Sequence, residues 1–283
     1  MLAGMASGTV VGAPVSSCCL PDGCYLPINR CNLPAKILGS LTFQLQPAPL
    51  RLDGVDALYP GLFSCLAGWS EQAQRAQQFI DYMDVHFTLN DPAAAGFVAG
   101  MGGRPKANWQ RTIRGWRFDT DGREGAVMKA WVESRFGLLP RYHSGVIRDL
   151  SSETYRRYIE ARARGLYNTN ALESQIDLLY SYCQYELALG DSDHLLLYRG
   201  VNRAAGLEQV GVDASGSPVL LLNNLNSFSR DAERASEFGD RVMRVRVPRQ
   251  KVVCYDALFP ALLKGEGEYL VVGGLYAIDG WVF

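Results

Sequence analysis

The chain has 283 residues, 48% of them hydrophobic, so it is long enough to bury a core as one large or two small domains. Its 28 Lys and Arg balance 29 Asp and Glu, and the formal net charge of -1 argues against a general nucleic-acid or polyanion binder. No apolar run reaches the roughly 18 residues of a membrane-spanning helix, so we predict a soluble protein without a membrane span.

The N-terminus and the cysteines indicate the compartment. No Lys or Arg precedes Arg30, so the positively charged start of a secretory signal is missing. The cysteine count is odd, at seven, which is not typical of a disulfide-stapled secreted domain. We therefore predict a cytoplasmic location. Four cysteines crowd near the N-terminus without paired C-x-x-C spacing or a nearby His, so packing is favoured over a metal site there: Cys18, Cys19, Cys24 and Cys31.

The first 60 residues differ in composition from the rest of the chain. They are rich in Gly, Pro and Ser, and prolines interrupt any regular element. We expect 1–60 to form an extended N-terminal arm that lies over the core.

Helical patterns begin near Ser70, where apolar residues recur at three- and four-residue steps. Further helices are predicted around Trp109 and Ala126, then from Ser151 or Ser152, and from Asn170, where Glu173 completes a capping-box-like start. The buried face of the last of these helices is predicted to comprise Leu172, Ile176, Leu179, Cys183 and Leu187. Residues 61–190 therefore form a mainly helical region.

Strand patterns dominate after about residue 190. The predicted strands are 194–199, 218–225, 241–247, 251–254, 268–272 and 275–283, and short helices are predicted after Ser229 and after Asp256. A helical first half followed by a β-rich second half is an α+β arrangement. We expect the β-rich core, 191–283, to pack with the helical region as one domain.

Polar residues stand out at three points of the β-rich half. In the first, the apolar strand Leu195–Tyr198 ends in Arg199, whose guanidinium can grip a phosphate, and Gly200 lets a ligand approach the backbone. In the second, Ser227 and Ser229 share one face if the strand continues. The alternative is that the strand ends there and that Ser229 caps the next helix.

The third point is Gly265–Gly273. At a strand start, Glu266 and Glu268 face the same side, and the glycines beside them leave space for a ligand. Two carboxylates so close together favour a positively charged partner between them. The alternative is a polar loop that leads into an edge strand.

The order Arg, Ser-x-Ser, Glu-x-Glu resembles the arginine-serine-glutamate class of ADP-ribosyltransferases. The resemblance covers about 194–283 and includes the strand at 242–247. One departure is Phe228, which stands where the class often has Thr and which should point away from the site. The resemblance implies an ADP-ribosyltransferase fold with a split β-sheet core and NAD as the substrate, with no metal.

A closer resemblance spans most of the chain. The run Glu124–Gly137, with Arg114-Gly115-Trp116 before it and Leu197–Asn202 after it, resembles the bacterial dinitrogenase reductase ADP-ribosyltransferases. That family implies an enzyme that modifies an arginine of dinitrogenase reductase, the nitrogenase iron protein. It also implies inactivation of nitrogenase when ammonium appears or energy falls, with a PII signalling protein as the regulator.

The resemblance assigns a separate task to each carboxylate. Cleavage of the bond between nicotinamide and ribose develops positive charge on the sugar, and a nearby carboxylate stabilises that charge. By resemblance, Glu268 takes this role and Ser227 holds its carboxylate in place. A guanidinium is a poor nucleophile while charged, so Glu266 is expected to orient the acceptor arginine and to accept its proton.

The resemblance also places residues around the nucleotide. Arg199 is expected to bind the phosphates or the adjoining ribose, and Gly200 the nicotinamide amide. Asn224 and Arg241 lie where relatives make further phosphate contacts, although both could be solvated strand ends. Phe238 could stack on the nicotinamide ring or could form the core face of a short helix.

Other functions remain open at this point. The same pocket would serve an NAD glycohydrolase, in which water replaces the acceptor, or an arginine-specific transferase with another protein target. A non-catalytic binding module is a further alternative, which the intact motif residues disfavour. A Rossmann dehydrogenase is disfavoured because no G-x-G-x-x-G follows a strand, and a P-loop is missing as well.

Overall fold

A computed structural model describes residues 19–91, 93–94, 107–202, 208–260, 262–263 and 267–282. The helices are α1 (Ala35–Leu38), α2 (Leu41–Leu45), α3 (Val55–Leu58), α4 (Pro60–Leu66), α5 (Gln72–His86), α6 (Trp109–Phe118), α7 (Arg123–Phe136), α8 (Glu153–Leu166), α9 (Leu172–Ala188) and α10 (Ala232–Ser236). The strands are β1 (His194–Val201), β2 (Glu208–Val212), β3 (Pro218–Ser229), β4 (Arg241–Pro248), β5 (Val252–Tyr255), β6 (Glu268–Ala277) and β7 (Gly280–Trp281). Two 3₁₀ turns, η2 (Arg249–Lys251) and η3 (Asp256–Leu258), flank β5.

The strands form one antiparallel sheet with the order β5-β6-β3-β1-β4-β7, and β2 pairs with the outer part of β3. β1 is in register with β4 over its whole length, from His194 opposite Pro248 to Val201 opposite Arg241. Its described pairing with β3 is limited to Tyr198 opposite Ser229. The predicted α+β fold with a split sheet is therefore confirmed, with the split between β1 and β3.

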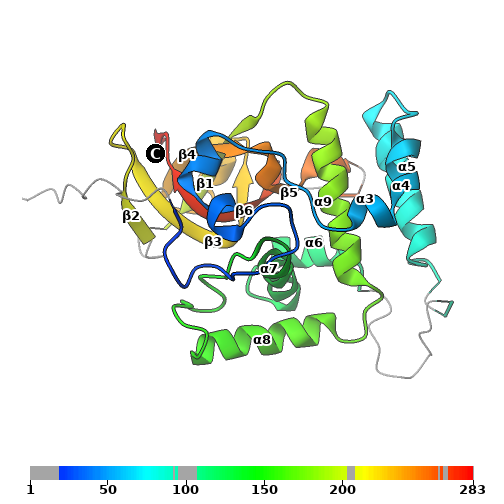
Figure 1. Cartoon of the computed structure of the whole chain (residues 1–283), viewed down its shortest axis with the longest axis horizontal. Helices are drawn as coiled ribbons and strands as arrows, with labels where there is room; N and C mark the ends of the chain where they lie inside the picture. The colour runs from blue at the N-terminus through cyan, green and yellow to red at the C-terminus, as the bar shows by residue number, and fades with distance from the viewer. Residues whose placement is uncertain are drawn as a thin grey trace, which may run out of the picture.

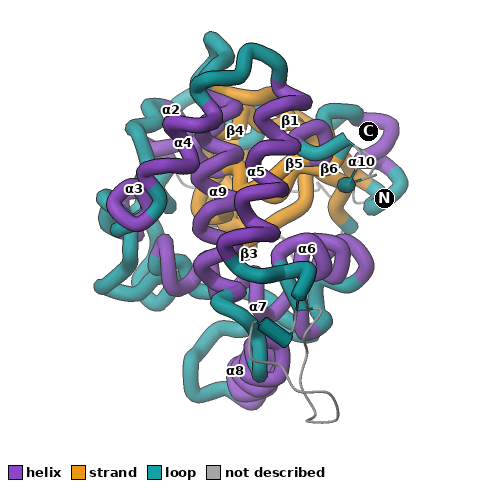
Figure 2. Tube along the Cα trace, turned by 90° about the vertical axis from the view of Figure 1, so that its right-hand side faces the viewer, coloured by secondary structure: helices purple, strands orange, loops and turns teal. Residues whose placement is uncertain are grey.

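Helices cover the sheet from two directions (Figures 1 and 2). On one side, α9 packs on β5, and α4 and α5 lie outside α9. On the other, α7 packs on β3, and α6 and α8 pack on α7. Burial of aromatic rings joins these layers, because Phe79 of α5 stacks on Tyr182 of α9 with their centroids 4.4 Å apart. Arg75 and Glu186 form a buried two-pronged ion pair between the same helices, with N–O distances of 2.7 and 2.8 Å.

The five long helices lie where their patterns predict them, but the start of the last one was misplaced. The short helix predicted after Asp256 is the 3₁₀ turn η3. Ser152 caps α8 as predicted, since its hydroxyl accepts a hydrogen bond from the backbone of Tyr155. The prediction that Asn170 caps the next helix is wrong. α9 begins at Leu172 after Ala171, which adopts a left-handed conformation with φ of 45°, and the side chain of Asn170 donates to the carbonyl of Phe87 instead.

The strand signals located most of the sheet but misplaced some ends. β3 continues to Ser229 instead of ending at Leu225, and β6 continues to Ala277, so 275–283 is not a separate strand. The long β3–β6 pairing contains a β-bulge near Asn223 and Gly273. Gly273 is required there, because a Cβ at this position would lie 1.7 Å from the carbonyl oxygen of Asn223. β2 was missed because its sequence, EQVGV, has only two strongly apolar residues.

The N-terminal stretch crosses the sheet and contains more helix than the extended arm that we expected. Three short helices, α1 to α3, lie within 35–58, and α2 contacts β4 and β6. Leu38 and Phe43 are buried in the same core as the strands. Cys24 and Cys31 are also buried, and burial raises the pKa of both thiols. In the described part of the chain, no group of three or more potential ligands could hold a metal ion.

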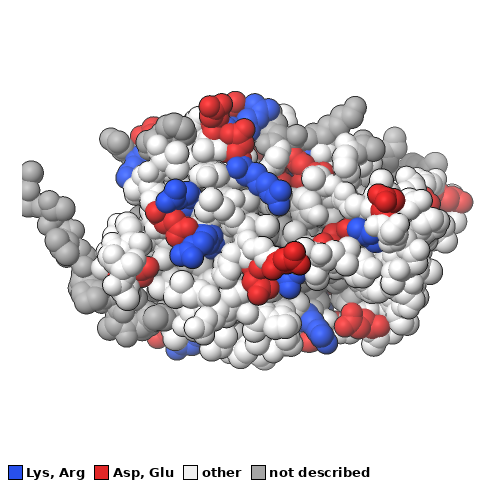
Figure 3. Space-filling model, turned by 90° about the horizontal axis from the view of Figure 1, so that it is seen from above, with Lys and Arg blue, Asp and Glu red and all other residues white. Residues whose placement is uncertain are grey.

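The helices and one face of the surface bear on the predictions about membranes and charge. Within these residues, no helix has the length and apolar character needed to cross a bilayer. Figure 3 shows Lys and Arg interspersed with Asp and Glu on the face that it presents, as the balanced composition predicts.

Candidate active site

Three strands bring the predicted catalytic motifs together beside the split of the sheet. Arg199 lies on β1, Ser227 lies on β3, and Glu268 is the first residue of β6. Glu268 is opposite Ser229 in the β3–β6 register, and Ser229 is two residues beyond Ser227 on β3. The side chains of Ser227, Ser229 and Glu268 therefore share one face of this strand pair. Arg199 joins them from the other side of the split, because its guanidinium donates to the Ser227 carbonyl at 2.6 Å.

Arg199 lies in a strongly desolvated position. Burial lowers its pKa to about 10, and the negative charge of Glu268 opposes that shift. Even at this pKa the side chain stays protonated at neutral pH. The site therefore presents a half-buried positive charge that an anionic ligand can neutralise, and this property suits the phosphate role expected of Arg199.

Helix α6 supplies two contacts that the sequence analysis did not assign. The indole Nε1 of Trp116 donates to the hydroxyl of Ser227 at 3.0 Å. The next residue, Arg117, forms an ion pair between its Nε and Oε2 of Glu268 at 2.8 Å. Among the described residues, no hydrogen bond joins Ser227 directly to Glu268. Both side chains are held by α6.

Asp256 is a further site residue that sequence reasoning missed. Its carboxylate pairs with the guanidinium of Arg117 and also accepts a 3.0 Å hydrogen bond from the backbone of Glu268. Asp256 was assigned only to the start of a short helix. No local pattern distinguishes it, because its partners are 139 and 12 positions away along the chain.

Ser229 serves the turn after β3 and is not a helix cap. Its hydroxyl accepts a hydrogen bond from the backbone of Asp231 at 3.0 Å. The cap of α10 is Asp231, whose side chain accepts from Glu233 at 2.8 Å. The alternative in which Ser229 caps this helix is therefore wrong.

The absence of a side chain at Gly200 is required by the packing of α10. A Cβ on Gly200 would lie 2.0 Å from the carbonyl oxygen of Ala235, which is backbone and cannot move away cheaply. Close approach of a helix therefore explains this glycine, whether or not a ligand also contacts its backbone.

Substitution of Gly200 by Ala should displace α10 from β1. We expect the free energy of unfolding to fall by about 1–3 kcal/mol, as for other insertions into tight packing. Denaturation by urea measures this loss. The matched control is Gly61→Ala in α4, where a Cβ would meet nothing within 4 Å and stability should be unchanged or slightly higher. Equal effects of the two substitutions would contradict the packing explanation.

Asn224 lies on β3 with Ser227, and its side chain makes hydrogen bonds within the protein. Its side chain is buried and donates to the carbonyls of Lys129 at 2.8 Å and Leu138 at 3.0 Å. Both amide hydrogens therefore tie β3 to α7 and its C-terminal loop. This geometry favours a structural role over the expected phosphate contact, and it also excludes the solvated strand end.

Phe238 and Arg241 follow α10 along the chain. The guanidinium of Arg241 lies 3.7 Å from the ring centroid of Trp281, at the start of β4 and opposite Val201. Phe238 has 65% of its surface exposed, so the alternative that places it in the core of a short helix is wrong. An exposed ring at this position remains free to stack on a ligand.

Glu266 lies outside the described residues, as does Gly265. The description resumes at Gly267, whose φ of 72° is in the left-handed region that favours glycine.

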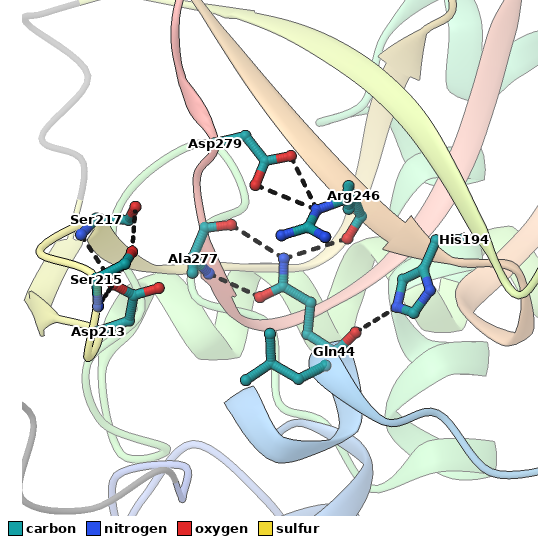
Figure 4. Close-up of a pocket in the computed structure, with 9 residues that line it drawn as sticks. Gln44, His194, Asp213, Ser215, Ser217, Arg246, Ala277 and Asp279 are labelled. Carbon is teal, nitrogen blue, oxygen red and sulfur yellow. Dashed lines mark hydrogen bonds and ion pairs between the residues drawn. The ribbon is translucent and has the colours of Figure 1, made fainter.

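A hollow between the N-terminal helices and the sheet, shown in Figure 4, is not a competing site. The side chain of Gln44 fills its floor with hydrogen bonds to Ala277 and to the carbonyl of Arg246. His194 bonds to the carbonyl of Gln44, and Arg246 pairs with Asp279. These polar groups bond to one another, which favours a structural role for the hollow.

The α+β fold with its split sheet is consistent with an enzyme of the ADP-ribosyltransferase class, and two sequence comparisons show that class. A sequence model described as "Dinitrogenase reductase ADP-ribosyltransferase (DRAT)" matches residues 28–279. The chain is 38% identical over 258 residues to the NAD(+)--dinitrogen-reductase ADP-D-ribosyltransferase of Rhodospirillum rubrum, covering 88% of this chain and 93% of the relative. The chain belongs to the dinitrogenase reductase ADP-ribosyltransferase family. No solved structure matches it.

Proposed function

We propose that this enzyme transfers ADP-ribose from NAD to an arginine of dinitrogenase reductase and thereby inactivates nitrogenase reversibly. The observation that carries the proposal is the convergence of Arg199, Ser227 and Glu268 from three strands in a family member that matches its relative almost end to end. The activity in the name of that relative supports the choice of acceptor.

The proposed roles follow from the charges at the site. The half-buried, desolvated guanidinium of Arg199 binds the phosphates of NAD or the ribose next to them. The carboxylate of Glu268 stabilises the cationic ribose as nicotinamide leaves. Ser227 orients this carboxylate once NAD is bound, and Glu266 receives the proton of the acceptor guanidinium.

The remaining nucleotide contacts are peripheral. We assign Gly200 a backbone contact with the nicotinamide amide and the exposed ring of Phe238 a stacking role. Arg241 contributes positive charge beside the phosphates. Asn224 acts through the position of β3, because its amide is committed to the carbonyls of Lys129 and Leu138.

Labelled NAD and purified dinitrogenase reductase test the acceptor. We expect transfer of label to the native iron protein and none to an iron protein that carries Lys in place of the modified arginine, because only the guanidinium fits the Glu-x-Glu site. Labelling must be measured across the nucleotide states of the acceptor. Label on both proteins would contradict arginine specificity. Label on neither would contradict dinitrogenase reductase as the acceptor, and the rate of NAD hydrolysis would then show whether the site cleaves NAD.

Regulation is proposed to come from a partner, in response to ammonium or energy status. The described residues are used by one sheet and its helices, which leaves no separate sensor domain among them. We propose a cytoplasmic enzyme controlled by a PII signalling protein, as the family resemblance implies. Retention of PII on the immobilised enzyme, in at least one nucleotide condition, is the expected result, and its absence in all conditions would remove this regulator.

The helical region and the β-rich core are proposed to act as one domain. α9 packs on β5 and α7 packs on β3, so the division at about residue 190 separates elements that share one core. Two helical residues, Trp116 and Arg117, reach the residues of the strands at the site itself.

A further inference from the structure

Two consecutive residues of α6 contact the two residues to which we assign the chemistry of ribose cleavage. Trp116 is 1% exposed, and its indole N–H donates to the hydroxyl of Ser227. Arg117 forms an ion pair with Oε2 of Glu268. Ser227 and Glu268 are on different strands, so one helix end controls the relative position of both side chains. We call Trp116 and Arg117 the α6 clamp.

Arg117 fixes Glu268 from two sides. It contacts one oxygen of the Glu268 carboxylate and pairs with Asp256, which in turn accepts the backbone N–H of Glu268. Both the side chain and the backbone of Glu268 are thus tied to the same ion pair. Because the contact uses Oε2, the other carboxylate oxygen can turn toward a ribose hydroxyl.

Helix α6 is anchored firmly enough to act as a support. Asn108 caps its start by accepting from the backbone of Arg111 at 2.9 Å, and Trp109 and Ile113 are completely buried. Gly115 allows α7 to approach closely, since a Cβ there would lie 2.5 Å from the side chain of Glu124. A rigid second layer of this kind holds reacting groups to the tolerance that catalysis requires.

We propose that the α6 clamp positions the catalytic residues: Trp116 sets the Ser227 hydroxyl, and Arg117, together with Asp256, sets the Glu268 carboxylate. The proposal rests on the roles given to Ser227 and Glu268 above. Neither clamp residue is assigned a contact with NAD. Their loss should therefore lower kcat for nicotinamide release and leave the KM for NAD nearly unchanged.

Trp116→Phe and Arg117→Gln are the principal test variants. Phe keeps an aromatic ring in the core and removes the N–H donor, and we expect kcat for NAD hydrolysis to fall about 10-fold, the equivalent of one lost hydrogen bond. Arg117→Gln removes an ion pair and should lower kcat by about 100-fold. Arg117→Lys retains the charge without the fork and should recover part of this loss. The KM for NAD should change less than about threefold in all of them.

The matched control is Arg111→Gln, an exposed arginine on the same helix, which should keep the kcat of the unmodified enzyme. Circular dichroism and thermal unfolding establish that each variant is folded. If Arg117→Gln does not fold, Arg117→Lys and Asp256→Asn decide the matter, since both keep the size of the side chain similar. A rise in KM without a fall in kcat would overturn the proposal.

A double-mutant cycle tests the contact itself. If Trp116 acts through Ser227, Trp116→Phe in a Ser227→Ala background should cost much less than 10-fold, because the hydroxyl that it positions is already gone. A merely structural role of the indole predicts equal losses in both backgrounds. Glu268→Gln distinguishes a failure of the proposed function from a failure of the α6 clamp. Retained NAD cleavage in that variant would refute the proposed function, whereas its loss, with the clamp variants behaving like Arg111→Gln, would refute the clamp alone.

Discussion

Substitution of Glu268 by Gln should lower the rate of NAD cleavage by about 1,000-fold or more, with transfer and hydrolysis lost together. The amide keeps the shape of the side chain but removes the negative charge that faces the developing ribose cation, a loss of roughly 4 kcal/mol of transition-state stabilisation. Nicotinamide release measures hydrolysis, and labelling of the acceptor measures transfer. The KM for NAD should change little.

The same pair of assays separates Glu268 from Glu266. Glu266→Gln should abolish transfer to arginine and spare hydrolysis. Transfer needs a carboxylate that accepts the proton of the acceptor guanidinium, whereas hydrolysis by water involves no guanidinium. The control is Glu160→Gln, on the exposed surface of α8, which should leave both rates unchanged. Equal loss of hydrolysis and transfer in the Glu266 variant would contradict the division of roles and would favour a simple glycohydrolase site.

Substitution of Lys251 by Met should stabilise the protein by about 2–4 kcal/mol at neutral pH. Lys251 is completely buried, and desolvation lowers its pKa from 10.5 to about 7. A shift of this size corresponds to an unfavourable contribution of about 5 kcal/mol, from which the loss of one hydrogen bond by the Met variant must be subtracted. That bond runs from the ammonium to the carbonyl of Gly273 at 3.0 Å.

The surroundings of Lys251 offset only part of this cost. The ammonium lies 4.5 Å from the ring centroid of Tyr276 and 5.7 Å from that of Phe43, which are favourable cation–π distances. In the described part of the chain, no carboxylate pairs with it. The charge is therefore compensated by dipoles and aromatic faces alone.

The dependence on pH has a definite sign. The unfolded chain binds the proton up to about pH 10.5 and the folded chain only up to about pH 7. The unfavourable contribution is therefore complete below pH 7 and disappears as the pH rises to 10.5, so stability increases with pH across this window. The Met variant should lack this component. Its advantage should be largest at and below pH 7 and should vanish above pH 10.5.

Urea denaturation at pH 6, 7 and 9.5 checks this expectation. Lys36→Met, at an exposed position of α1, is the matched control and should change stability by less than about 0.5 kcal/mol at each pH. A Lys251→Met variant that is less stable than the unmodified protein at pH 6 would show that the ammonium contributes favourably to the fold. The contacts described for Lys251 are with Gly273, Phe43 and Tyr276 and with no assigned site residue, so its substitution should preserve activity.

The local signals in the sequence located most elements, for a physical reason. Apolar periodicity reports which face of a segment is buried, so α5 to α9 and five of the strands were recognised without knowledge of their partners. The ends of these helices and strands were harder to predict from the sequence. The start of α9 depends on Ala171 and on a side chain that bonds to Phe87, and the length of β6 depends on pairing with β3.

The site shows the same limit. Arg199, Ser227 and Glu268 were recognised because their order along the chain resembles a known motif, and the structure brings them together. Trp116 appeared only in a resembling sequence run, and Asp256 not at all as a site residue. Both act across long sequence separations, which composition and spacing cannot report. Asn224 is the opposite case, since its position in the motif suggested a nucleotide contact whereas its amide donates hydrogen bonds to two carbonyls of the interior.

The nearly unpaired seam between β1 and β3 has a consequence for the way in which substrate binding acts on the protein. Arg199 belongs to the β1–β4–β7 part of the sheet, and Glu268 belongs to the β3–β6–β5 part. A nucleotide held by both residues bridges two leaves that share little backbone hydrogen bonding. In the proposed function, NAD contacts both parts of the sheet and so adds interactions across a seam where the described strand pairing is limited to Tyr198 and Ser229.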